Sequence, residues 1–425
     1  MAANPTARTA ARTSSWSTEP AATGLDMPRA LTVVQLLPAM ASGGVERSTL
    51  EIADALVRAG HRAIVVSAGG RLVPQLLAGG AEHVELDIGR KSLATLRQVR
   101  PLRELLARAR ADVVHARSRL PAWIGWRALR GLPAGQRPRF VTTVHGLNSP
   151  SRYSAIMTRG ERVVCVSGTV RDYVLHHYPR TDAAKLRVIP RGIDPRAFPP
   201  APWPDREARA GVAAQHPQLG GDGPLLLLPG RGTRLKGHAD ALELLARLRA
   251  DGLDARLWMP GGREPARTGY IAELESQAAT LGIADALAIT PPTTAIADAY
   301  AASDLVLQLS RKPEAFGRTV IEALSVGRPL LGWAHGGAGE LLRELQPAGA
   351  VDPFDAAALH AGARALLDGL AARLAALRAT MPALVARYSL HAMQRATLAV
   401  YDELAHDESR LDERMQDKPV QAPGA

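Results

Sequence analysis

Short apolar runs alternate with helix-like segments along most of this 425-residue chain, and this alternation constrains the fold more than any other feature. The first runs are LTVVQLL (31–37), AIVVSA (63–68), HVELD (83–87), DVVHA (112–116), FVTTVH (140–145) and RVVCVS (162–167). Runs this short and this apolar are typical of strands buried on both faces of a parallel sheet. Crossover helices then cover both faces, and ligands approach the carboxyl ends of the strands.

The alternation stops at about residue 198 and starts again at about residue 225. Between them, FPPAPWP and a segment ending in GGDGP indicate a linker. The second series of runs is LLLLPG (225–230), ARLWMPGG (255–262), LAIT (287–290), DLVLQLS (304–310) and PLLGW (329–333). We predict an α/β fold of two facing Rossmann-like, doubly wound domains, with a cleft between them and a helical C-terminal segment.

Breaks in the pattern set the expected boundaries. Residues 1–28 are rich in Ala, Thr, Ser and Pro and lack the apolar core of a secretory signal, so we expect a disordered tail. A start codon placed too early, ahead of Met27, is the alternative. The other expected parts are a domain at 29–200, a linker at 201–224, a domain at 225–375, helices at 376–405 that return to the first domain, and a charged tail at 406–425.

The net charge of +11 comes almost entirely from arginine, because the chain has only five lysines. One explanation is the base composition of the genome; the other is affinity for phosphate-bearing partners or an anionic membrane. Nucleic acid is not an expected partner, because aromatic residues make up 4% of the chain and no recognition-helix motif occurs.

Membrane-spanning and disulfide-bonded architectures are not expected. No apolar stretch reaches the roughly 18 to 20 residues that cross a bilayer. The single cysteine, Cys165, rules out an intrachain disulfide and favours a reducing, cytoplasmic compartment. The segment RPLRELLARARA (100–111) predicts a basic amphipathic helix, which either packs on the first sheet or also meets lipid headgroups at the inner face of the membrane.

The segment EAFGRTVIE (314–322) carries the most chemical information. Glu314 and Glu322 lie eight residues apart and flank a predicted strand-to-helix turn at Phe316 and Gly317. Free amides at a helix N-terminus suit a diphosphate, and carboxylates accept hydrogen bonds from hydroxyls. Together these groups suit a nucleotide sugar, although glutamates at this spacing are also common on solvated helices.

Two glycine-containing loops support the same interpretation. In LPGRGTRLKGH (228–238), Arg231 and Lys236 lie five residues apart, so both can reach one anion; an ordinary basic loop is the alternative. Gly43 and Gly44 precede a predicted helix after the first strand, where glycine lets backbone amides approach a phosphate, or simply makes a turn.

These motifs, taken in order, resemble the retaining nucleotide-sugar glycosyltransferases of family 4, over roughly residues 31–400. The matching segments are GGVE (43–46), DVVHARSRLPAW (112–123), VTTVHG (141–146), VIPRGID (188–194), GRGTRLKG (230–237), EAFGRTVIEAL (314–324) and GGAGE (336–340). The HARSR and PRGID variants look most like the bacterial members that build lipopolysaccharide core. The family has the GT-B fold, with an acceptor-side first domain and a donor-binding second domain.

The resemblance implies a role for each matching residue. Glu322 would bind the donor ribose, Glu314 would contact the transferred sugar, and Arg231 with Lys236 would hold the diphosphate. His145 would lie beside the donor sugar, although a lone histidine is more often structural. Arg191 replaces the asparagine that is commoner in the family, and its role is left open. The remaining donor-binding positions are Gly43, Gly44, Phe316, Gly317, Arg318 and Thr319.

The implied reaction is same-face substitution of a hexose or heptose onto a lipopolysaccharide or other lipid-linked glycan acceptor. The departing phosphate takes the acceptor proton, so no protein base is required. No His, Cys and Asp cluster at metal-ligand spacing occurs, and we predict no cofactor and no essential metal.

Three other functions are compatible with parts of the sequence. A dinucleotide oxidoreductase is disfavoured because G-x-G-x-x-G does not follow the first strand. A non-catalytic sugar-binding scaffold is possible for any fold, but the intact charged positions argue against it. A phospholipid, small-molecule or polysaccharide acceptor is the main alternative. The segments ITPPTT (289–294) and RKP (311–313) depart from the usual family pattern, so the sugar and the base are left open.

Overall fold

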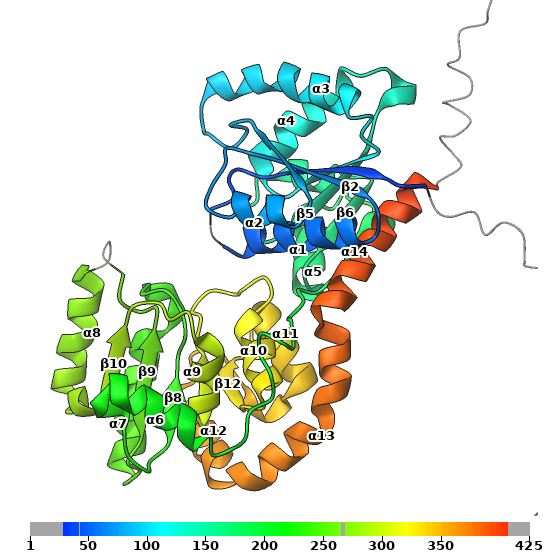
Figure 1. The fold of residues 1–425 in the computed structure, drawn as a ribbon. Coiled ribbons are helices and arrows are strands. Elements are labelled where there is room, and N and C mark those ends of the chain that lie inside the picture. The colour runs from blue at the N-terminus through cyan, green and yellow to red at the C-terminus, as the bar shows by residue number, and fades with distance from the viewer. Residues whose placement is uncertain (1–28, 42, 265–267, 407–425) are drawn as a thin grey trace, which may run out of the picture. The chain divides into compact units, whose positions relative to one another are not determined.

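The structure is a computed structural model that describes residues 29–41, 43–264 and 268–406. The tail expected at 1–28 lies outside the described residues, as does the tail expected at 406–425 except for its first residue. From Leu31 onward the described residues belong to one compact unit, in which two parallel sheets follow each other along the chain (Figure 1).

The first sheet has seven parallel strands in the order β3-β2-β1-β4-β5-β6-β7. Its strands are β1 (Thr32–Leu36), β2 (Arg62–Ser67), β3 (Glu82–Glu85), β4 (Val113–Ala116), β5 (Arg139–Val144), β6 (Arg162–Cys165) and β7 (Leu186–Val188). Every residue of β4 and β5 is buried, which is why apolar residues occur on both faces of these strands rather than at alternate positions. The sequence does not predict β7, because three residues are too short a run to stand out.

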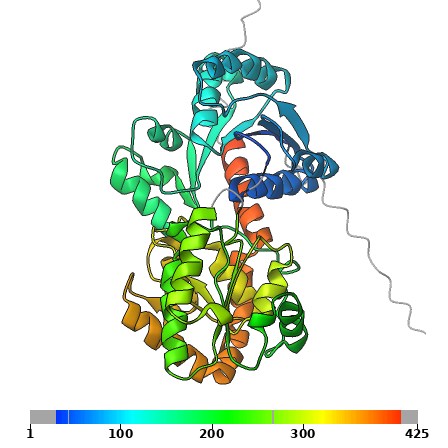
Figure 2. The same ribbon diagram turned by 90° about the vertical axis from the view of Figure 1, so that its left-hand side faces the viewer.

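Helices connect these strands and lie on both sides of them (Figure 2). The α-helices of this half are α1 (Gly44–Arg58), α2 (Val73–Ala78), α3 (Val99–Arg108), α4 (Arg119–Arg130) and α5 (Gly168–His177). Short 3-10 helices lie at η1 (Leu93–Gln98), η2 (Ala134–Gln136), η3 (Ser154–Thr158) and η4 (Ala183–Lys185). Leu102 and Leu106 of α3 are buried, so the apolar face of this basic helix packs inside the first half.

The second sheet has six parallel strands in the order β10-β9-β8-β11-β12-β13. They are β8 (Leu225–Leu227), β9 (Arg256–Pro260), β10 (Leu287–Thr290), β11 (Leu305–Gln308), β12 (Leu330–Trp333) and β13 (Ala350–Val351). The helices are α7 (His238–Ala250), α8 (Thr268–Thr280), α9 (Ile296–Ala302), α10 (Arg318–Val326), α11 (Gly336–Leu345) and α12 (Ala356–Asp368), with η6 (Arg234–Lys236), η8 (Ala284–Ala286) and η9 (Pro347–Gly349). In each sheet the first strand lies centrally and the order reverses beside it, so the predicted pair of Rossmann-like domains is confirmed.

The segment expected to be a linker, 201–224, contains a helix that belongs to the second half. Helix α6 (Arg206–Gln215) begins after Asp205, whose side chain accepts a hydrogen bond from the amide of Ala208, and η5 (Pro217–Leu219) follows it. Arg209 forms an ion pair with Asp304 at 3.2 Å beside β11. The flanking prolines and glycines mask this helix in the sequence.

Two final helices, α13 (Leu370–Tyr388) and α14 (Leu390–Ala405), complete the described chain. Helix α14 lies against α1 of the first half (Figure 1). Gln394 donates a hydrogen bond of 2.7 Å to the carbonyl of Glu51, and the Tyr401 hydroxyl lies 2.6 Å from Nδ1 of His115. The last helix therefore contributes buried polar contacts to the first domain.

Candidate active site

The predicted turn at residues 316–317 lies at the start of α10. Gly317 has φ +93°, and a Cβ there would come 2.7 Å from Cα of Ala338, so only glycine fits without strain. Helix α10 begins at Arg318 with no side chain capping its first amides. These amides are available to an anion, as at other helix N-termini.

The GGAGE motif at the start of α11 holds the loop that carries Glu314. The amide of Gly337 donates to the carbonyl of Glu314 at 2.7 Å. A Cβ on Gly336 or Gly337 would lie 2.5 to 2.6 Å from backbone atoms of this loop. The last residue of the motif, Glu340, accepts from the amides of Gly168 and Thr169 at the start of α5, at 3.0 and 2.8 Å. The motif therefore fixes the Glu314 loop and caps a helix of the first half.

Glu314 is held as a carboxylate by neighbouring donors. Nζ of Lys236 lies 2.5 Å from its Oε1, and the Ser310 hydroxyl donates to the same oxygen. Burial raises the pKa of Glu314, but the charge of Lys236 and hydrogen bonds from Lys236, Ser310 and Gln308 outweigh it, and the pKa is lowered. The loop that leads into α10 thus carries an ionised carboxylate.

Lys236 and Arg231 occupy different environments in the loop after β8. Gly237, in a left-handed conformation with φ +75°, would clash with the carbonyl of Leu309 if it carried a Cβ, so the end of this loop lies against the end of β11. Lys236 is thereby brought to Glu314. Arg231 is exposed. The structure brings one of the two predicted cations together with a predicted carboxylate.

The pKa of Glu322 is shifted in the opposite direction to that of Glu314. Burial raises its pKa, against the lowering effect of Arg318 and of a hydrogen bond from Tyr300. The Tyr300 hydroxyl donates to Oε2 of Glu322 at 2.9 Å, and Thr319 also contacts this hydroxyl. Tyr300 is buried, and its own pKa is raised well above the usual value by burial and then by the nearby carboxylate. The two predicted glutamates therefore occupy sites with different proton affinities.

His145 follows β5, and its imidazole contacts Arg191. Nη2 of Arg191 lies 2.6 Å from Nδ1 of His145. Burial, and then the positive charges of Arg191 and Arg117, lower the pKa of His145 well below the ordinary value, so the ring is neutral. Its Nε2 is buried and has no hydrogen-bond partner among the described residues.

Other buried side-chain atoms without a hydrogen-bond partner among the described residues include Oε2 of Glu51 on α1 and Nη2 of Arg318 on α10. These two side chains form an ion pair at 3.8 Å. Burial raises the pKa of Glu51, although the charges of Arg318, Arg191, Arg47 and Arg117 lower it. Because buried polar groups are rarely left unpaired, these atoms are available to hydrogen-bond a ligand or an ordered water.

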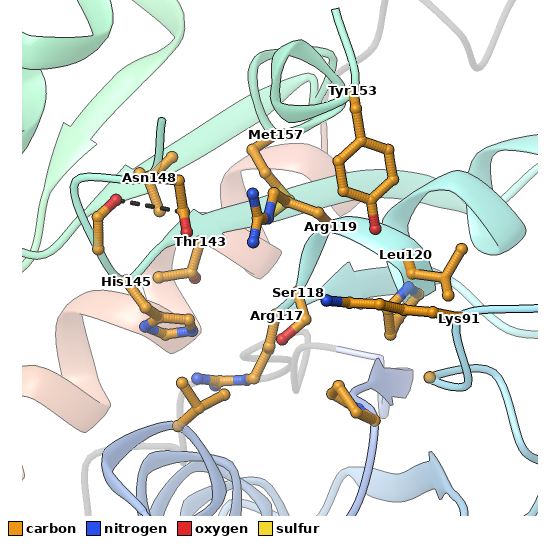
Figure 3. A pocket seen from close by; sticks show the side chains of 16 residues that line it. Lys91, Arg117, Ser118, Arg119, Leu120, Thr143, His145, Asn148, Tyr153 and Met157 are labelled. Atoms are coloured by element: carbon orange, nitrogen blue, oxygen red, sulfur yellow. Dashed lines mark hydrogen bonds between the residues drawn. The ribbon is translucent and has the colours of Figure 1, made fainter. Parts of the chain in front are cut away.

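A pocket of about 330 Å³ lies at the carboxyl ends of β1, β4 and β5, and His145 is among its lining residues. Lys91, Arg117 and Arg119 also line it, and none of the described residues around it is acidic. Arg117 is almost fully buried and donates to Gln35 at 2.8 Å and Ser48 at 3.1 Å. Figure 3 shows Lys91, Arg119 and Tyr153 around one part of the pocket, and His145 with Arg117 around another.

The two glycines at the start of α1 have different constraints. Gly43 has φ +141°, whereas a Cβ on Gly44 would have no heavy atom within 4 Å. Both are exposed at the start of α1, where no side chain caps the helix.

Phe316 is buried and packs near Tyr388.

Sequence reasoning missed Glu51, Tyr300 and Ser310. Ser310 ends the predicted run DLVLQLS, so its place at a strand end was a usable signal. Tyr300 reaches Glu322 from α9, a contact that depends on how α9 and α10 pack. Glu51 lies in the middle of an amphipathic helix, where a charged residue is unremarkable.

The described residues contain neither a metal-binding cluster nor a membrane-spanning helix. No group of three or more His, Cys, Asp or Glu side chains in the described ranges is placed to hold a metal ion. Within the same part of the chain, no helix has the length and apolar character needed to cross a membrane.

The sequence matches two glycosyltransferase family models. The model described as Glycosyltransferase Family 4 matches residues 42–197, and the one described as Glycosyl transferases group 1 matches residues 213–376. A D-inositol 3-phosphate glycosyltransferase of Geodermatophilus obscurus is 30% identical over 281 residues, which is 60% of this chain and 59% of that protein. The chain therefore matches less than two thirds of that relative's length.

Solved structures give longer alignments. The crystal structure of a glycosyltransferase from Rickettsia africae has a TM-score of 0.79 and 29% identity, and the match covers 89% of this chain and 99% of that one. Anabaena Alr3699/HepE in complex with UDP-glucose has a TM-score of 0.72 over 87% of this chain and 99% of that one; at 18% identity it shows the fold alone. Two glycosyltransferase family models thus match the chain one after the other, and the near-complete structural match shows that the chain has the GT-B fold.

Proposed function

We propose that this chain is a retaining glycosyltransferase that moves a hexose or heptose from a nucleotide diphosphate to a phosphate-bearing acceptor, such as lipopolysaccharide core. The observation that carries the proposal is the ion pair of Lys236 with Glu314, which belongs to the loop that leads into the uncapped start of α10. A cation and helix amides suit a diphosphate, and a carboxylate suits a sugar that becomes positively charged during transfer. Support for the donor class also comes from the UDP-glucose complex of Anabaena HepE.

In the proposed reaction, the acceptor oxygen forms a bond to the anomeric carbon on the face from which the diphosphate leaves. The bond between that carbon and the phosphate oxygen breaks, and the departing oxygen takes the acceptor proton. Lys236, Arg231 and the amides of Phe316 to Thr319 stabilise the growing negative charge on the diphosphate. Glu314 stabilises the positive charge on the sugar, so no protein base and no metal ion is required.

Other groups would bind the donor without taking part in bond breaking. Glu322 would accept from ribose hydroxyls, held in place by the Tyr300 hydroxyl at 2.9 Å. Gly43 and Gly44 would let the start of α1 approach the phosphates. His145 would face the transferred sugar, because its Nε2 is a buried polar atom without a partner in the described chain.

The acceptor class is proposed from the pocket in the first half. Lys91, Arg117 and Arg119 line it without an acidic neighbour among the described lining residues, which favours an acceptor with phosphate or carboxylate groups. Lipopolysaccharide core carries such groups. A small phosphorylated polyol is the second candidate, favoured by the similarity to a D-inositol 3-phosphate glycosyltransferase.

We also propose a peripheral position at the inner face of the cytoplasmic membrane. Leu93 of η1 is 87% exposed and lies close to α3, whose Arg100 and Arg108 are exposed. Exposed leucines beside arginines suit an anionic bilayer surface. Wild type should float with vesicles that contain phosphatidylglycerol but not with phosphatidylcholine vesicles, and Leu93→Glu should reduce flotation. Equal binding to both vesicle types would contradict the proposal.

Transfer itself is tested by incubating the protein with UDP-, GDP- and ADP-linked sugars and two acceptors, a deacylated lipopolysaccharide core oligosaccharide and D-inositol 3-phosphate. Mass spectrometry identifies the product, and proton NMR gives its anomeric configuration. We expect one donor to yield a product that keeps the donor's configuration, and Glu314→Gln to abolish it. An inverted product would contradict the retaining mechanism, and transfer to inositol phosphate alone would replace the first acceptor with the second.

A further inference from the structure

The contact between Arg191 and His145 fixes which nitrogen of the imidazole carries the proton. A guanidinium group has only donors, so Nδ1 of His145, at 2.6 Å from Nη2 of Arg191, must be the acceptor. A ring whose Nδ1 accepts is neutral and carries its proton on Nε2. Arg191 therefore determines both the charge and the tautomer of His145.

Burial and the nearby positive charges also favour the neutral form of His145. Burial lowers its pKa, and the charges of Arg191, Arg117 and the neighbouring His115 lower it further. Glu51 is the one carboxylate among the charged groups that act on Arg191, where it opposes the effects of Arg117 and Arg318. The proton on Nε2 has no partner among the described residues, although the atom is buried. A buried donor without an acceptor indicates that the acceptor is an atom of a ligand.

The backbone around Arg191 is held by the C-terminal helices. A Cβ on the next residue, Gly192, would lie 2.5 Å from Cα of Leu390, so the chain passes directly against the start of α14. The amide of Ile193 donates to the carbonyl of Tyr388 at 2.9 Å, and its carbonyl accepts from the amide of Leu390 at 2.7 Å. Arg191 is thus presented to His145 from a rigid segment rather than from a free loop.

We propose that Arg191 is a positioning residue that holds His145 as the neutral Nε2–H tautomer, so that His145 donates one hydrogen bond to an oxygen of the transferred sugar. The inference rests on the proposed glycosyl transfer and adds a restriction to it. Since Nδ1 is occupied by Arg191 and Nε2 already carries a proton, His145 serves only as a donor and takes no proton from the acceptor. The ligand atom that pairs with Nε2 must therefore be a hydrogen-bond acceptor, such as the oxygen of a sugar hydroxyl or of a carbonyl.

The tautomer is measured directly by 15N NMR of protein labelled at histidine, because protonated and unprotonated ring nitrogens differ widely in chemical shift. The signals of His145 are identified among those of the 12 histidines by their loss in His145→Gln. We expect Nε2 protonated and Nδ1 unprotonated from pH 6 to 8 in wild type, and a mixture of tautomers in Arg191→Met. A protonated Nδ1 in wild type would overturn the proposal. This readout requires no turnover, so it is independent of the proposed activity.

A double-mutant cycle separates positioning from general support of the fold. Arg191→Met and His145→Gln should each lower kcat/KM by about 10-fold, the loss of one hydrogen bond. The double variant should lose little more than either single variant, and Arg191→Lys, which keeps a donor, should recover part of the rate. If the losses of kcat/KM in the two single variants multiply in the double variant, Arg191 does not act through His145. If wild type shows the expected tautomer but no transfer with any donor, the tautomer assignment stands and the proposed function fails.

Discussion

Nζ of Lys236 lies 2.5 Å from Oε1 of Glu314, although the two residues are 78 positions apart in the sequence. The contact joins the loop after β8 to the loop before α10, at the carboxyl ends of adjacent strands. It also lowers the pKa of Glu314 against the effect of burial. One interaction therefore brings a cation to the proposed diphosphate site and keeps the carboxylate ionised beside the proposed sugar site.

Lys236→Ala should lower kcat/KM by about 100-fold, because it removes charge stabilisation of the leaving diphosphate. The substitution also raises the pKa of Glu314. Activity that needs the ionised carboxylate falls as pH drops through that pKa, so the acid limb of kcat/KM should move to higher pH. Steady-state kinetics between pH 4.5 and 8 measure both effects.

Arg234→Ala is the matched control for Lys236→Ala. Arg234 is a cation of the same short helix, but it pairs with Glu273 at 2.5 Å and stacks over Tyr270 at 4.9 Å. Its removal should change kcat/KM by less than about 2-fold, as for other exposed ion pairs. Equal losses in the two variants would mean that overall loop charge, rather than the contact with Glu314, supports activity.

The two glutamates should give different kinetic signatures. Glu314→Gln should lower kcat by about 100-fold or more with little change in the donor KM, because its charge acts in the transition state. Glu322→Gln should raise the donor KM by about 10-fold with kcat nearly unchanged, because it loses a charge-assisted hydrogen bond to bound donor. Similar, small effects on both constants would contradict this division of roles.

Tyr300→Phe tests the support of Glu322. The lost hydroxyl donates to Oε2 of Glu322, and without it the raised pKa of that carboxyl rises further. The donor KM should therefore increase about 3-fold, and increase more as pH falls, while the free energy of unfolding drops by about 1 kcal/mol. Kinetics and urea denaturation measure the two effects. A fall in kcat at constant KM would show that Tyr300 acts elsewhere.

Gly317→Ala should disturb the start of α10. The residue has φ +93°, and the added methyl group would lie 2.7 Å from Ala338. We expect the free energy of unfolding to fall by about 2 kcal/mol and donor binding to weaken. In the control, Gly211→Ala within α6, a Cβ meets nothing within 4 Å, and stability should stay equal or rise by about 0.5 to 1 kcal/mol. Unchanged donor binding in Gly317→Ala would argue against a role for these amides.

The fold could be predicted because its strands are buried on both faces. Val113 to Ala116 and Phe140 to Val144 lie within short runs that stand out from the helices around them. The short strands β7 and β13 give no such signal, and α6 is hidden between prolines and glycines. Helix α6 forms in spite of these breakers, and it packs against α9 of the second half.

Site residues at strand ends were also predictable. Lys236, Glu314 and His145 all follow predicted strands, where parallel sheets bind ligands. Contacts that depend on how helices pack could not be predicted from the sequence. Examples are the contact of Tyr300 with Glu322 and that of Glu51 with Arg318. The role of Arg191 could be predicted only in part. Its departure from the family asparagine is visible in the sequence, but its effect on His145 depends on how α14 holds the segment.

The central claim is tested most directly by the thermal unfolding midpoint of purified wild type, Lys236→Ala, Arg231→Ala and Arg234→Ala with UDP, GDP or ADP. A ligand that binds only the folded state raises the midpoint. We predict that one nucleotide diphosphate, at millimolar concentration, stabilises wild type and Arg234→Ala but neither Lys236→Ala nor Arg231→Ala. No stabilisation of wild type by any of the three would contradict the account.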